Sequence, residues 1–202
     1  QTTAGGKVCR GANISATGTN AISTGLGIPV IGNAGTIAFW YKANTAWSGA
    51  GTQDVQLLDA TTVTGKWFSL VRRGGTGANA GKLRFVVTDS TNTARSVETA
   101  AIAVAAGTFK HIAISWNFNN IALPNNDRLR IYVDGVQQAQ TVITSTTLTL
   151  SPTIGTLNIG GTRAGFSETG VTTASADGVG EEFRAYNYEA SAATVVSLRD
   201  QN

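Results

Sequence analysis

The sequence predicts an all-β protein, an antiparallel sandwich or barrel with one short helix near its C-terminal end. Short runs rich in β-branched and aromatic residues recur along the chain, and Gly, Asn, Ser and Thr turns separate them. Residues 128–140 carry a strong hairpin signal, because Asp134-Gly135 divides two alternating runs and accepts the positive φ angles of a tight turn. Only residues 191–200 have helical character.

The expected elements follow from the local patterns. The predicted strands lie, in order, at residues 36–43, 55–60, 66–72, 82–89, 109–117, 128–140, 156–161 and 181–187. The run at 109–117 alternates cleanly, which places Ile112, Ile114 and Trp116 on one face. At the C-terminal end, Ser191 can cap a helix that continues through Ala192-Ala193.

The predicted hairpin raises a question about its polar face. The alternation places Leu129, Ile131 and Val133 on one side of the strand and Arg128, Arg130 and Tyr132 on the other. If the second face belongs to a concave sheet, it can hold a glycan or an acidic partner. If that sheet is convex, the same three side chains are simply solvated.

Composition favours one domain with a sizeable core and few surface charges. Of the 202 residues, 42% are hydrophobic and 13% are charged, about half the usual charged share. We expect residues 1–11 to form an extended N-terminal arm and residues 12–202 to form a single domain. The net charge of +3 is scattered rather than clustered, which argues against nucleic-acid binding.

The absence of Met and the start at Gln1 indicate a chain cut from a precursor or a longer protein, and we expect an extracellular or cell-surface location. No apolar run approaches the roughly 18 residues of a membrane-spanning helix. Cys9 is the single cysteine, so an internal disulfide is excluded. It is either a small buried residue or a thiol that pairs with another chain.

The order of the motifs resembles the laminin-G-like, concanavalin A-like lectin and glucanase superfamily. The resemblance rests on GTIAFWYKA, FKHIAISWN, RLRIYVDGV, LNIGG and the tail DGVGEEFRAYNYEASAATVVSLRD, and it covers residues 13–200. Six tail residues fall in register with the family pattern: Gly178, Glu182, Arg184, Tyr186, Asn187 and Leu198. Two positions depart from it, because Phe109-Lys110 precedes His111 where a Trp is usual, and Glu181 stands where an Asp is usual.

The resemblance implies a two-sheet antiparallel jelly roll, a fold that hosts many functions. Relatives often hold one structural Ca²⁺ through the acidic residue that matches Glu181. A glutamate can serve, because Ca²⁺ accepts carboxylate and carbonyl oxygens in flexible geometry. An ordinary surface glutamate near Arg184 is the alternative.

The sequence argues against an enzyme. The resemblance implies that a hydrolase with this sandwich, of the laminarinase type, would carry two carboxylates on one face of a strand. Retaining hydrolysis needs these two groups about 5–5.5 Å apart. Glu181 and Glu182 are adjacent, so they point to opposite faces of a strand. His111 is the single imidazole and lies in a predicted strand, where a structural role is expected.

Two hypotheses of different classes remain. The first is a non-catalytic recognition module for a glycan or surface ligand, for which Arg128, Arg130 and Tyr132 and the loop aromatics Trp47 and Phe166 are the candidate residues. Each of these two aromatics is either an exposed platform or a side chain folded back onto its own domain. The second is a self-assembling structural subunit of a filament, surface layer or virion. Three features of the chain favour contacts between copies: the low charge, the N-terminal arm and the apolar loop at 119–127.

Overall fold

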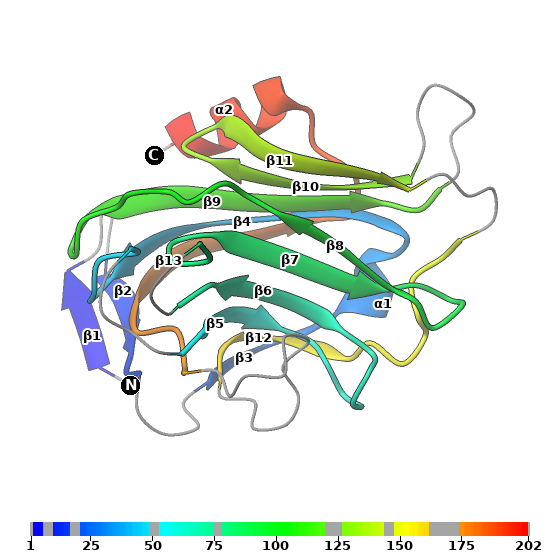
Figure 1. Cartoon of the computed structure of the whole chain (residues 1–202), viewed down its shortest axis with the longest axis horizontal. Helices are drawn as coiled ribbons and strands as arrows, with labels where there is room; N and C mark the ends of the chain where they lie inside the picture. Colours follow the sequence, from blue (N-terminus) through cyan, green and yellow to red (C-terminus); the bar gives the residue numbers. More distant parts are fainter. Residues whose placement is uncertain are drawn as a thin grey trace.

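The computed structural model describes residues 2–5, 10–16, 21–48, 53–74, 78–119, 127–143, 148–161 and 174–201. Within these ranges, thirteen strands form two antiparallel sheets packed face to face, with two short helices beside them (Figure 1). The predicted two-sheet jelly-roll sandwich is confirmed. No helix in the described part is long and apolar enough to span a bilayer.

One sheet has seven strands in the described residues, in the order β1-β2-β13-β4-β9-β10-β11. Their bounds are β1 Thr2–Gly5, β2 Arg10–Ile14, β13 Gly178–Tyr186, β4 Ala34–Ala43, β9 Phe109–Asn117, β10 Asp127–Val133 and β11 Val136–Ile143. The hairpin of β10 and β11 turns at Asp134 and Gly135, whose φ angles are 51° and 81°. This confirms the turn that the sequence predicts.

The second sheet has six strands in the same ranges, in the order β3-β12-β5-β6-β7-β8. Their bounds are β3 Ala21–Gly27, β12 Thr156–Gly160, β5 Val55–Asp59, β6 Phe68–Arg72, β7 Leu83–Thr88 and β8 Ala94–Glu98. Strands β3 and β8 were not predicted. Both are edge strands with exposed positions, and neither carries the run of β-branched and aromatic residues that marks the predicted strands.

The predicted arm contributes strands to the sandwich. Residues 2–5 pair with residues 10–13 at the edge of the seven-stranded sheet, and β2 continues the pairing onto β13. Cys9 lies outside the described residues, as do residues 120–126 of the predicted contact loop. A role of the arm and of residues 119–127 in contacts between copies therefore stays a prediction.

Aromatic packing between the sheets fixes the end of the sandwich where α1 (Ile28–Ile31) lies. Trp116 on β9 is fully buried, and its ring meets Phe68 of the opposite sheet edge-on at 5.1 Å. Its indole N–H donates to the carbonyl of Gly32, 3.0 Å away, at the end of α1. A Cβ at Gly35 would lie 2.2 Å from the Trp116 ring, so glycine is needed for this approach.

The outer face of the seven-stranded sheet is partly covered by α2 (Ala192–Asp200), which lies over β10 and β11 (Figure 1). The hydroxyl of Ser191 accepts a hydrogen bond from the Thr194 N–H at 3.1 Å, which confirms the predicted cap. Val195 and Leu198 pack on Tyr132 and on small residues of β4 and β9. The helix thus supplies a second, smaller apolar cluster.

Candidate functional site

Trp47 is not the exposed loop residue that the sequence predicts. Its side chain is 1% exposed and belongs to the main core, where its ring lies 6.3 Å from that of Tyr41. The Trp47 backbone N–H donates to the carbonyl of Val104 at 2.9 Å, which ties the polar loop back onto the domain. The prediction of an exposed platform at Trp47 is therefore wrong, because tertiary contacts bury it.

The polar stripe of β10 is also covered. Tyr132 is 1% exposed beneath α2. Arg128 and Arg130 both reach the carboxylate of Glu189, with N–O distances of 2.7 and 2.5 Å. The prediction that this face is open to solvent or to a glycan is thus wrong: the segment that leads into α2 closes it.

Glu189 is the centre of this closed network. Its side chain is 8% exposed and also accepts a hydrogen bond from the Asn117 amide at 2.9 Å. Burial alone would raise the pKa of Glu189. The hydrogen bonds from Arg128 and Asn117 and the charges of the two arginines outweigh burial and hold the pKa below its ordinary value. The carboxylate therefore stays ionised and serves the fold.

Glu181 lies on the outer face of the seven-stranded sheet and is 7% exposed. Asn13 faces the same side on neighbouring β2, and its buried amide oxygen accepts no hydrogen bond in the structure. A carboxylate and an amide oxygen are donors that Ca²⁺ takes. In the described ranges no three His, Cys, Asp or Glu side chains gather, so backbone carbonyls would have to complete the shell. A structural calcium site at Glu181 therefore stays a proposal.

We expect Ca²⁺ to raise the melting temperature if Glu181 and Asn13 hold it. An ion that binds only the folded state adds stability, about 2.7 kcal/mol at 100 times its Kd. The measurement is a melting curve in calcium and then in chelator, repeated for Glu181→Gln. Identical midpoints in calcium and chelator for the unaltered chain would show that no such site exists.

The described residues expose a different surface, centred on α1. Gly27 precedes this single turn, Pro29 occupies its second position and Gly32 ends it at a φ of 99°. Ile28 and Ile31 are buried and hold the turn in place, whereas Val30 is 81% exposed. We call this region the α1 surface, defined by residues 26–33, residues 150–154 and residues 185–188.

One pocket of the α1 surface lies between the turn and the end of β13. This open depression has a volume of about 290 Å³ and is lined by Leu26, Val30, Ile31, Ala185, Tyr186 and Asn187. This volume is close to the lower end of ligand pockets, roughly 300–1,000 Å³. The pocket combines aliphatic walls, one aromatic residue and one planar amide.

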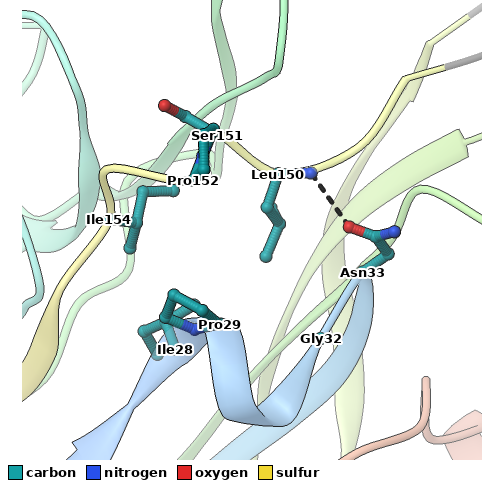
Figure 2. A pocket seen from close by; sticks show the side chains of 8 residues that line it. All are labelled: Ile28, Pro29, Gly32, Asn33, Leu150, Ser151, Pro152 and Ile154. Carbon is teal, nitrogen blue, oxygen red and sulfur yellow. Dashed lines mark hydrogen bonds between the residues drawn. The ribbon is translucent and has the colours of Figure 1, made fainter.

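A second pocket lies on the other side of the same turn (Figure 2). It encloses about 110 Å³. Figure 2 shows Leu150 above Ile28 and Pro29, with Ile154 to one side. At the far side, the Asn33 side-chain oxygen accepts a hydrogen bond from the Leu150 N–H at 3.0 Å, which fixes the wall of this small apolar pocket.

Tyr188 is the one exposed aromatic side chain among the residues that the structure describes, with 45% of its surface accessible. Its ring lies 5.4 Å from that of Tyr186 at an angle of 49°. The Tyr188 carbonyl accepts a hydrogen bond from the Thr36 hydroxyl at 2.8 Å, which fixes the backbone there. An exposed ring beside an amide and an apolar pocket can stack on an apolar face of a ligand and hydrogen-bond its edge.

The α1 surface was not predicted from the sequence, although the sequence contains a pattern that indicates it. Tyr186, Asn187 and Tyr188 place two aromatics around an amide directly after the last strand, and Pro29 and Gly32 mark a short helical turn. Phe166, the second predicted platform, lies outside the described residues, so its role stays a prediction.

Comparison with known proteins supports the fold. A family model described as the concanavalin A-like lectin/glucanases superfamily matches residues 16–196. A search of curated proteins by sequence finds no match.

Solved structures of similar shape include two domains of carbohydrate-active proteins. Domain 4 of AbnA, a GH43 extracellular arabinanase from Geobacillus stearothermophilus solved with arabinotriose, has a TM-score of 0.59 and 16% identity, covering 98% of this chain and 80% of that one. The CBM40 of the Ruminococcus gnavus IT-sialidase, bound to alpha2,3 sialyllactose, has a TM-score of 0.62 and 16% identity, covering 94% and 96%.

The binding domain of botulinum neurotoxin serotype C1 is also similar in shape. Its TM-score is 0.54 at 10% identity, over 84% of this chain and 36% of that one. At such identities these likenesses show the fold.

Proposed function

Because the chain belongs to the concanavalin A-like lectin/glucanase superfamily, we propose that it is a non-catalytic, extracellular glycan-binding module that uses the α1 surface. The observation that carries this proposal is the exposed ring of Tyr188 beside Tyr186 and Asn187. An aromatic ring packs on the apolar face of a sugar, while an amide hydrogen-bonds its hydroxyls.

The comparisons support this proposal at the level of the fold. The arabinanase domain was solved with arabinotriose and the sialidase module with sialyllactose, so sandwiches of this shape present glycan sites. The neurotoxin binding domain is a binding domain as well. None of these ligands is thereby assigned to this chain.

The residues of the α1 surface support binding rather than catalysis. Among the described residues that line its two pockets there is neither a carboxylate nor an imidazole. Glycoside hydrolysis needs a pair of carboxyl groups across the scissile bond. A ligand held here would meet side chains that position it and none that transfer its protons.

We expect Tyr188→Ala to weaken glycan binding by about tenfold or more, since the loss of an aromatic anchor commonly costs about 2 kcal/mol. Tyr188→Trp should retain binding, because it keeps an aromatic face. Binding is measured by calorimetry with glycans selected on an array. The control is Val136→Ala, which changes an exposed apolar side chain at the turn end of the β10–β11 hairpin, at the other end of the sheet from α1. Equal affinities for the unaltered chain and Tyr188→Ala would refute the site.

A further inference from the structure

The two pockets of the α1 surface lie on opposite sides of one helical turn. Leu26, Val30 and Ile31 line the larger pocket, and Ile28, Pro29 and Gly32 line the smaller one. The exposed neighbours Pro29 and Val30, one from each lining, form the ridge between the pockets. A ligand that fills both pockets must cross this ridge. The arrangement of the two pockets therefore constrains the length of the ligand as well as its chemistry.

The ridge is preformed, so a ligand would meet a fixed shape. The Ile28 N–H donates to the carbonyl of Gly155 and the Gly32 N–H to the carbonyl of Ile28, both at 3.1 Å. Trp116 holds the Gly32 carbonyl from below. A surface fixed in this way loses little conformational freedom when it binds.

The sizes of the pockets set the scale of the ligand. The smaller pocket, at about 110 Å³, has less than half the volume of the larger one. It accepts a substituent such as a methyl or hydroxymethyl group rather than a sugar chain. The larger pocket, at about 290 Å³, accepts about one sugar unit. Contact with both pockets thus requires more than one unit.

The absence of charge in the pocket linings indicates what kind of ligand the α1 surface can bind. No described residue that lines either pocket carries a charge. Glu189, the ionised group nearest in sequence to Tyr188, and its partners Arg128 and Arg130 line neither pocket. A ligand carboxylate would lose its hydration here and gain no cation in return.

From these observations, and resting on the glycan-binding function proposed above, we infer that the ligand is an uncharged oligosaccharide that crosses α1 and contacts both pockets. Tyr188 and Asn187 bind one unit, and the ridge of Pro29 and Val30 carries the chain to the pocket beneath Leu150. Recognition extends over several units of the chain.

The test is a glycan array that contains acidic glycans and neutral backbones of increasing length, followed by calorimetry on the neutral series that binds best. Affinity should rise by about tenfold from one unit to three or four and then level off, because the second pocket buries further apolar surface. Binding should not change between about 0.05 and 0.5 M salt, since screening acts on charges.

Two variants test separately how the ridge and the exposed ring of Tyr188 contribute to binding. Pro29→Asp should remove the rise with length and leave single-unit binding unchanged, because exposed Pro29 lines only the smaller pocket and the new charge would be desolvated only under a longer ligand. Tyr188→Ala should weaken binding at every length. Val136→Asp is the matched control: Val136 is 60% exposed on the β10–β11 hairpin, and its replacement should change neither.

Each of the remaining outcomes contradicts one part of the proposal. Equal affinity for one unit and for longer chains, or a rise that persists in Pro29→Asp, overturns the crossing of the ridge while glycan binding stands. Tighter, salt-sensitive binding of acidic glycans overturns the neutral ligand. If the folded chain binds no glycan on the array, the proposed function itself fails.

Discussion

Trp47→Ala should destabilise the domain by about 3–5 kcal/mol, the usual result of deleting a buried tryptophan side chain. Trp47 is 1% exposed, packs on Tyr41 and joins the core that both sheets share. The hydrogen bond from the Trp47 backbone N–H to the Val104 carbonyl would survive the substitution, so the expected loss comes from side-chain packing.

Equilibrium unfolding in denaturant measures this effect as a lower transition midpoint. Tyr188→Ala is the informative comparison, because Tyr188 is 45% exposed and its truncation should change the free energy of unfolding by less than about 0.5 kcal/mol. The two variants should therefore behave in opposite ways, with stability lost in one and binding in the other. A Trp47→Ala chain of unchanged stability that no longer binds glycan would restore Trp47 as a platform.

Most strands could be predicted because the residue patterns that define them involve only neighbours in the sequence. Alternation in residues 109–117 and the Asp134-Gly135 turn depend only on neighbours in the sequence, and both are confirmed. Edge strands such as β8 carry polar residues at positions that a central strand would bury, so their pattern resembles a loop. The turn of α1 is too short to show a helical period, and its Ile and Val favour strands in isolation.

The site could not be predicted in the same way, because exposure depends on contacts between distant segments. Trp47 stands among polar and glycine residues, which is typical of an exposed loop, yet Val104 covers its backbone from a different loop. The stripe of Arg128 and Arg130 alternates as a solvated face would, yet Glu189 lies against it, about 60 residues later. Tyr188, in contrast, is left exposed where the chain passes from β13 to α2.

We expect Glu189→Gln to cost about 3 kcal/mol of stability at neutral pH. Removing one partner of a buried ion pair commonly costs about 3–5 kcal/mol, and the arginine side chains retain 17% exposure, which places this case at the lower end. Without the carboxylate, two guanidinium groups would face each other over a neutral amide. The segment that carries α2 would then lose its main polar attachment to β10.

The same network predicts how stability depends on pH. The pKa of Glu189 is lower in the folded chain than in the unfolded one, so its contribution is fully present above the unfolded pKa, near 4.3, and is lost as pH falls through the folded pKa. Asp89 and Glu98 also have lowered pKa values, so the unaltered chain alone cannot isolate one carboxylate. The difference in unfolding free energy between the unaltered chain and Glu189→Gln can. It should be constant between about pH 6 and 8 and shrink steadily below about pH 4. A difference that stays the same down to about pH 2 would mean that the lost stability comes from packing and not from the charge of Glu189.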